Sequence, residues 1–102
     1  MFIILWEYVV LAGQEAEFEK FYGANGNWTQ LFSQGKGYLG TELFRDPDHP
    51  RRYITLDRWS PFAAYDSFQK NYRTEYDALD AYCSPLTEYE ARMGAGTLIL
   101  PT

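Results

Sequence analysis

Residues 2 to 10 (FIILWEYVV) form a strand-like segment that is apolar on both of its faces. Alternate residues of a strand point to opposite sides of a sheet, so one side carries Phe2, Ile4, Trp6 and Tyr8 and the other carries Ile3, Leu5 and Val9. A strand of this kind is normally covered on both sides. The chain must therefore supply, or recruit, two apolar layers for this strand.

The rest of the chain alternates helical and strand patterns. Helical spacing of apolar residues predicts helices over residues 14 to 22 and around Trp28, Leu31 and Phe32. Residues 38 to 45 and 52 to 59 are predicted strands, joined as a hairpin by a loop of turn-forming residues, DPDHP. Further helices are predicted after Ser60-Pro61 and after Thr74. We expect a last helical segment from Leu86 to Met93 and a fourth strand over residues 97 to 100.

This order of elements predicts an α+β fold with a ferredoxin-like split β-α-β repeat. In that fold a four-stranded antiparallel sheet has its helices on one face. One helical layer covers only one side of the first strand. We therefore expect the other side to meet a second copy, so that two protomers form a dimeric α+β barrel across a twofold axis. The 102 residues are expected to make one domain, 1-102.

Charge and composition narrow the possible partners. The formal net charge is −5, and Arg51-Arg52 is the only local basic cluster, so no nucleic-acid partner is expected. The longest apolar run, Phe2 to Trp6, is far shorter than a membrane helix, so no membrane partner is expected. The single cysteine, Cys83, allows no internal disulfide, which fits a reducing compartment. The expected localisation is cytoplasmic.

Residues of the usual catalytic and metal-binding types are few. The sole histidine, His49, lies in the DPDHP loop, where a solvated role is expected, and Cys83 lies on an apolar helical stripe and is expected to be buried. No metal site is predicted, because one His and one Cys match no ligand spacing. No glycine-rich phosphate cradle opens a helix, so neither a flavin nor a nicotinamide cofactor is predicted.

Aromatic residues are the strongest remaining signal. Nine Tyr and three Trp carry more polar groups than a small core readily satisfies. Some of them are expected to line a wet or ligand-filled cavity. The alternative is that they pack at a dimer interface and under the helices with their hydroxyls in solvent.

Three segments together resemble a known family. They are WEYVVLAGQEAEF at residues 6 to 18, GYLGTEL at 37 to 43 and YITLDRWS at 53 to 60. In this combination the chain, from Phe2 to Leu100, resembles the antibiotic biosynthesis monooxygenase family of dimeric α+β barrels, and in particular its short bacterial members. The resemblance implies a homodimer with an apolar pocket between the sheet and the helices of each protomer.

The family resemblance implies several possible activities. Members include oxygenases that need no cofactor and oxidise phenolic polyketides, relatives that act on quinols, and haem-degrading enzymes. The haem-degrading branch uses an Asn, a Trp and a His whose positions fall here at Trp6, Phe68 and Ala78, so none of the three matches. A haem-binding or haem-degrading function is therefore disfavoured, since haem iron in that branch needs an axial imidazole.

The favoured hypothesis is a monooxygenase that needs no cofactor and acts on a small aromatic substrate, a phenol or a quinol. Such an enzyme removes a proton, holds the anion and shields the radical pair from water. The pocket is predicted to contain Trp6, Tyr8, Tyr65, Phe68 and Tyr72, with Trp28 and Tyr76 at its rim.

Arg58 and Arg73 are possible anion stabilisers, although ion pairs with Asp57 and Asp77 are the alternative use of each. The sequence names no general base. Glu7 and Asp57 both lie on predicted strands, and Glu7 points away from Trp6. Two further hypotheses stay open: a non-catalytic dimeric module that binds an apolar small molecule, and an assembly protein whose pocket is filled by its own side chains.

Overall fold

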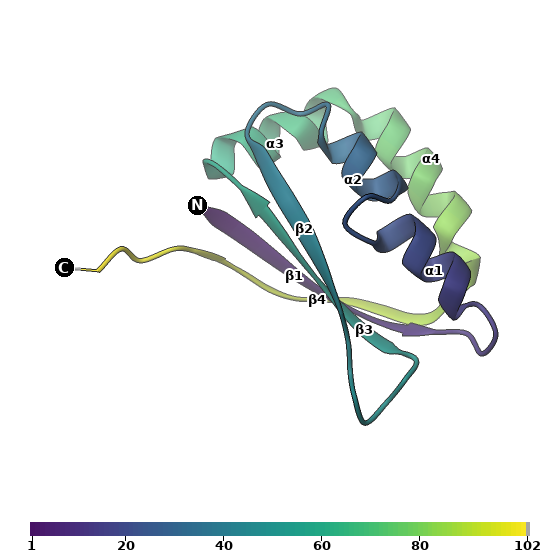
Figure 1. The fold of residues 1–102 in the computed structure, drawn as a ribbon. Helices are drawn as coiled ribbons and strands as arrows, with labels where there is room; N and C mark the ends of the chain where they lie inside the picture. Colours follow the sequence, from purple (N-terminus) through teal and green to yellow (C-terminus); the bar gives the residue numbers. More distant parts are fainter. Residues whose placement is uncertain (102) are drawn as a thin grey trace.

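The computed structural model describes residues 1–101. Its strands are β1 (Phe2–Val10), β2 (Tyr38–Arg45), β3 (Arg52–Trp59) and β4 (Thr87–Thr97), and its helices are α1 (Glu15–Tyr22), α2 (Asn27–Phe32), α3 (Phe62–Asn71) and α4 (Arg73–Cys83), followed by a 3₁₀ turn, Ser84–Leu86. The strands form one antiparallel sheet in the order β2-β3-β1-β4. The helices lie together on one side of this sheet (Figure 1). The predicted ferredoxin-like α+β fold is therefore confirmed.

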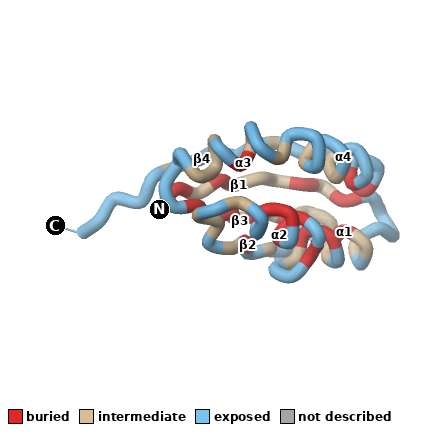
Figure 2. The backbone as a smooth tube through the Cα atoms, turned by 90° about the horizontal axis from the view of Figure 1, so that it is seen from above, coloured by how far each residue is buried: buried red, intermediate tan, exposed pale blue. Residues whose placement is uncertain are grey.

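The fourth strand lies elsewhere than the sequence predicted. Residues 86 to 93 were expected to be helical, but Thr87–Thr97 is a strand that pairs with β1 from Val10 back to Phe2. The predicted strand over residues 97 to 100 is also wrong, because β4 ends at Thr97. Residues 87 to 93 are a strand because pairing with β1 outweighs their helical preference. The strand ends at Thr97 because Thr97 pairs with Phe2, the first residue of β1. Leu98, Ile99 and Leu100 are left exposed in a tail that leaves the body of the molecule (Figure 2).

Strand alternation builds the core between the sheet and the helices. Phe2, Ile4, Tyr8 and Val10 of β1 are buried, as are Tyr53, Thr55, Asp57 and Trp59 of β3. The aromatic rings of α1, α2 and α3 pack onto them. Phe18 lies against Tyr8 and Tyr53, while Phe32 and Phe68 lie against Trp59. The core is thus mainly aromatic, with buried polar residues on β3 in its midst.

The opposite side of the sheet carries no helix, and we call it the open face. The residue pairing places on it Ile3, Leu5, Val9, Phe44, Ile54, Leu56 and Tyr89. Ion pairs between Arg52 and Glu7 and between Arg58 and Glu42 flank these apolar residues. The prediction that β1 is apolar on its second side is therefore correct, and in the single chain that side is only half-buried.

A glycine fixes the entry into β2. Gly37 has φ +94°, a value that side chains rarely tolerate, and an added Cβ would lie 2.5 Å from the carbonyl oxygen of Ser60 and 2.6 Å from Cβ of Ala64. The same turn is closed by a hydrogen bond from the Ser60 amide to the Gly37 carbonyl. Close contact between this turn and the start of α3 therefore requires glycine. Within residues 1–101, no helix is long and apolar enough to cross a membrane.

Candidate functional site

A small cavity lies between the helix-covered face of the sheet and helices α1, α2 and α4. Its volume is about 30 Å³, comparable with the space of one water molecule in the liquid. Every strand contributes to its wall, which is formed by Trp6, Tyr8, Tyr22, Trp28, Phe32, Thr41, Thr55, Asp57, Tyr76, Asp80 and Glu90. A ring-sized ligand would need the aromatic walls to move apart, and Trp6 and Tyr76 are only partly buried.

Asp57 is the most unusual group in the cavity wall. Its residue is 7% exposed, and Thr41 Oγ1 donates a hydrogen bond to its Oδ1 at 2.6 Å. Burial raises the pKa of Asp57 to about 6, although the hydrogen bond from Thr41 opposes the rise. No ion pair among residues 1–101 involves Asp57. The cavity therefore holds a buried carboxyl that titrates near neutral pH, as a general base requires.

Tyr8 stands near Asp57 on the neighbouring strand as a protonated phenol. Its hydroxyl lies 3.4 Å from Thr55 Oγ1, and burial raises the pKa of Tyr8 well above its ordinary value. Phe18 and Tyr22 pack edge-on against its ring, with centroids at 5.2 and 5.0 Å. Tyr8 is thus a fixed hydrogen-bond donor in the cavity wall.

Trp28 supplies an unused donor to the same wall. Its Nε1 is buried and makes no well-aligned hydrogen bond among the residues that the structure describes, although the Tyr22 hydroxyl and the Cys83 thiol lie close to it. Its ring contacts Tyr76 edge-on at 5.0 Å. A buried donor without a partner is costly, and a polar ligand that reached it would remove that cost.

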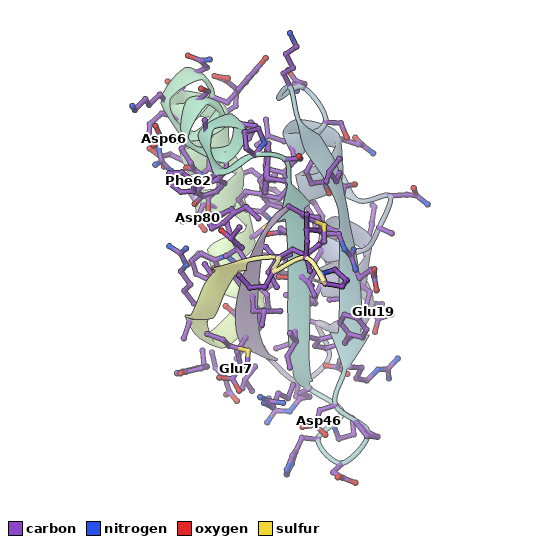
Figure 3. All side chains as sticks on the ribbon, turned by 90° about the vertical axis from the view of Figure 1, so that its left-hand side faces the viewer. Glu7, Glu19, Asp46, Phe62, Asp66 and Asp80 are labelled. Atoms are coloured by element: carbon purple, nitrogen blue, oxygen red, sulfur yellow. The ribbon has the colours of Figure 1, made fainter. Side chains whose placement is uncertain are left out.

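Two further carboxyl groups lie on the cavity wall. Glu90 of β4 pairs with Tyr8 in the sheet, and Asp80 comes from α4. In Figure 3, Asp80 lies on the helical side of the molecule with Phe62 and Asp66, whereas Glu7 and Asp46 lie toward the lower end of the sheet. Burial and the charge of Asp80 raise the pKa of Glu90. The described wall has no Lys or Arg, so the cavity disfavours an anionic ligand.

The structure brings some of the predicted pocket residues together. Trp6, Tyr8, Trp28 and Tyr76 all line the cavity. Their role in binding stays a prediction. Cys83 is buried, as expected, and His49 lies in the exposed loop between β2 and β3, away from this cavity.

Three predicted pocket residues, Tyr65 and Phe68 of α3 and Tyr72 in the turn that follows it, lie beside the cavity and do not line it. Phe68 is 1% exposed and packs in the core against Trp59. Tyr72 stacks on Phe68, and its hydroxyl donates to the Gln34 carbonyl at 3.2 Å. Tyr65 packs against Phe2 and Trp59. The α3 stripe therefore covers the Trp59 end of the sheet, while α4 covers the cavity.

The two arginines occupy ion pairs. Arg58 pairs with Glu42 on the open face, because the alternation of β3 turns it away from Asp57. Arg73 pairs with Asp77 at 3.0 Å, and its guanidinium lies 4.7 Å from the ring centroid of Tyr76. Neither arginine lines the cavity.

Seven residues of the cavity wall were not predicted from the sequence as site residues: Tyr22, Phe32, Thr41, Thr55, Asp57, Asp80 and Glu90. A signal for Asp57 was present, because alternation within RYITLDRW places it on the same face as Tyr53, Thr55 and Trp59. Glu90 had no usable signal, since its segment was predicted to be helical.

Comparison with known proteins supports the fold and identifies the family. Solved structures similar to this chain include SnoaB from Streptomyces nogalater, described as a cofactor-independent oxygenase (20% identity, 98% of this chain and 94% of that chain, TM-score 0.71). Others are two proteins described as putative antibiotic biosynthesis monooxygenases, from Bordetella bronchiseptica (17%, 97% and 97%, TM-score 0.73) and Deinococcus radiodurans (18%, 100% and 99%, TM-score 0.69). No curated protein sequence matches the chain. The family model for antibiotic biosynthesis monooxygenase matches residues 1–76, and the chain belongs to that family.

Proposed function

We propose that this protein is a cofactor-independent monooxygenase that oxidises a small, neutral phenol or quinol in the cavity between its sheet and its helices. Family membership supports an oxygenase in general, and SnoaB, of similar fold, is described as cofactor-independent. The observation that carries the proposal is the combination of an aromatic wall with one buried carboxyl, Asp57, that has a raised pKa.

The chemistry needs little from the protein. A phenol that loses its proton becomes an electron-rich phenolate that can pass one electron to dioxygen. The radical pair then combines at carbon, and loss of water gives a quinone, so one phenol and one O₂ yield one quinone and one H₂O. The aromatic wall excludes water from the radical pair, and the Tyr8 and Trp28 donors can hold the substrate oxygen.

The charge of the wall points to a neutral substrate. Asp57, Asp80 and Glu90 contribute carboxyl groups, and the described wall has no basic side chain. A substrate carboxylate would be repelled at short range in a poorly solvated site. Neutral naphthols and naphthalenediols satisfy this condition and supply the electrons.

Oxygen consumption tests this function directly. The purified protein is mixed with 1-naphthol or 1,5-naphthalenediol in air, and oxygen uptake, quinone absorbance and ¹⁸O incorporation from ¹⁸O₂ are measured. We expect quinone formation that carries the label. Thr55→Leu, which fills the cavity, should abolish turnover, and Thr74→Leu at an exposed position of α4 should not. Quenching of Trp fluorescence by the phenols without oxygen uptake would refute the oxygenase and indicate a binding module.

We also propose that the open face binds a second copy of the chain. Its central residues, among them Leu5, Ile54 and Leu56, are half-buried in one protomer, and Phe44 and Tyr89 are 47% and 49% exposed. A contiguous apolar face of this kind typically marks an interface. The flanking ion pairs Arg52–Glu7 and Arg58–Glu42 give it a polar border.

Sedimentation equilibrium tests the dimer. The wild-type protein and the variant Ser67→Glu, altered on the exposed side of α3, should both give a molar mass of twice 11.9 kDa. Leu56→Glu places a charge in the centre of the open face and should sediment at 11.9 kDa. A wild-type protein that stays monomeric at high concentration would contradict the proposal.

A further inference from the structure

Two separate hollows include residues of β2, the edge strand of the sheet. The inner one is the cavity described above, and Thr41 and Asp57 form part of its wall. The outer one is an open surface groove lined by residues of α2 and the start of β2, among them Thr29, Ser33 and Tyr38. No residue lines both hollows. A chain of hydrogen bonds nevertheless joins them.

This chain of hydrogen bonds runs from Asp57 through Thr41 to Tyr38. Thr41 Oγ1 lies 2.6 Å from Asp57 Oδ1 and 2.6 Å from the Tyr38 hydroxyl. Thr41 is 8% exposed and Asp57 is 7% exposed, whereas Tyr38 is only partly buried. The buried carboxyl is therefore two hydrogen bonds away from a tyrosine on the groove.

Donor counting fixes the direction of this chain. A hydroxyl group has one proton to donate. Thr41 donates that proton to the Asp57 carboxylate, so the Tyr38 hydroxyl must donate to Thr41. Both donors therefore point toward Asp57 while it is ionised. When Asp57 gains a proton, the same contacts can reverse, with Asp57 donating to Thr41 and Thr41 donating to Tyr38.

We propose that Asp57 accepts the proton of the substrate and that Thr41 and Tyr38 relay a proton between the cavity and the outer groove. This inference rests on the proposed phenol oxidation. The substrate O–H bond breaks and an O–H bond forms on Asp57. Asp57 then passes a proton to Thr41 as Thr41 passes its own to Tyr38 and Tyr38 passes its own to water. No electron moves in this step, and the chain can carry a proton inward when water is formed.

The surroundings of Asp57 suit this role. The titratable groups that share its cavity are Tyr8, Tyr22, Tyr76, Asp80 and Glu90, and none of them is a cation that would hold Asp57 ionised. The opposing Ile4 on β1 is apolar. Thr41 is thus the only hydrogen-bond partner of Asp57's side chain among residues 1–101. A proton that leaves Asp57 along these hydrogen bonds must therefore pass through Thr41.

Three variants interrupt the relay with little change of shape. Tyr38→Phe removes the hydroxyl and keeps the ring that packs on Phe32 and Trp59. Thr41→Val removes the central hydroxyl, and Thr41→Ser restores it. The control is Tyr82→Phe, which loses a hydroxyl on a 63% exposed residue of α4.

The first measurement needs no turnover. The ¹³C resonance of the Asp57 side-chain carboxyl is titrated by NMR in each protein. Because the bond from Thr41 favours the ionised carboxylate, Thr41→Val should raise the pKa of Asp57 further, and Tyr38→Phe should raise it by a smaller amount. Thr41→Ser and Tyr82→Phe should leave it unchanged. A pKa of Asp57 that does not respond to Tyr38→Phe would overturn the relay.

The second measurement follows the steady-state oxidation of 1-naphthol. We expect Asp57→Asn to lower kcat about 100-fold and Tyr38→Phe to lower it about tenfold, with KM unchanged. Thr41→Ser should recover most of the rate lost in Thr41→Val. An active enzyme whose kcat is unaffected by Tyr38→Phe would overturn the relay alone. A wild-type protein that oxidises none of the phenols would overturn both the proposed function and the inference, since no substrate proton would need to move.

Discussion

Replacing Asp57 by Asn should make the protein more stable at neutral pH. Asp57 lies in the core at 7% exposure with one hydrogen bond, from Thr41, and with no cation beside it. Ionising such a group in the folded protein costs free energy that the unfolded chain does not incur, because water solvates the carboxylate there. Asn has nearly the same shape, stays neutral at every pH, and can still accept the Thr41 hydrogen bond through its side-chain oxygen.

The size of this effect follows from the pKa of Asp57. Its folded value of about 6 lies above the ordinary value of 3.8, so the folded state holds a proton that the unfolded state has already lost. Stability contributed by Asp57 is therefore fully present below pH 3.8 and is lost as the pH rises through about 6. The difference between the two pKa values corresponds to a loss of about 3 kcal/mol between pH 3 and pH 8.

Urea unfolding measured at a series of pH values isolates this contribution. The free energies of unfolding of the wild type and of Asp57→Asn are determined from tryptophan fluorescence at fixed protein concentration. Their difference should grow by about 3 kcal/mol in favour of the variant between pH 3 and pH 8, with most of the change between pH 4 and pH 6. The amide hydrogens of Asn add a constant cost of about 1 kcal/mol, which shifts the whole curve but not its slope. A difference that is flat with pH, or that falls, would refute the reasoning.

Three further substitutions test other parts of the fold by the same unfolding assay. Gly37→Ala should cost at least about 2 kcal/mol, because the new Cβ would meet Ser60 and Ala64 in a left-handed turn; a neutral result would mean that the turn relaxes. Phe68→Ala should cost about 3 to 5 kcal/mol, since the ring is 1% exposed between Phe32 and Trp59. Arg73→Ala should cost less than about 1 kcal/mol, because its bond to Asp77 joins two exposed side chains on one helix.

Three of the four strands could be predicted from the sequence with their observed bounds. Residues 2 to 10, 38 to 45 and 52 to 59 are each rich in β-branched and aromatic residues, and turn-forming residues bound the last two. The hairpin of β2 and β3 is specified locally by the DPDHP loop between them. Local sequence suffices where a segment's own preference and its final environment agree.

The fourth strand could not be predicted because the helical preference of its own residues disagrees with its environment beside β1. The segment TEYEARMGAGT contains Glu, Ala, Arg and Met, which favour helices, and it lacks a strict apolar alternation. Register shifts between Leu5 and Trp6 and between Val9 and Val10 interrupt its pairing with β1, so any alternation is further blurred. Its strand conformation comes from β1, whose second edge needs a partner. The apolar tail, residues 98 to 100, drew the prediction away from it.

Local sequence was also insufficient to predict the contacts of single residues in the candidate site. Alternation places Asp57 on the covered face of β3, but only the sheet register shows that Thr41 lies opposite it and that Arg58 pairs across to Glu42. A salt bridge between neighbouring Asp57 and Arg58 was a natural alternative from sequence, and it is excluded because adjacent strand residues face opposite sides. Asp57 is left buried without a cation, and this isolation gives it a raised pKa.

The loss of folding stability caused by the buried Asp57 carboxylate indicates that this residue has a functional role. A neutral residue such as Asn would fill the same space and accept the same hydrogen bond without the loss of about 3 kcal/mol at neutral pH. Packing therefore does not explain why this position carries a carboxylate. A site that must accept a proton does explain it, since burial is what brings the pKa of Asp57 from 3.8 to about 6, nearer to that of a phenol. The destabilisation and the proposed chemistry thus have one physical cause, which is the exclusion of water from the cavity.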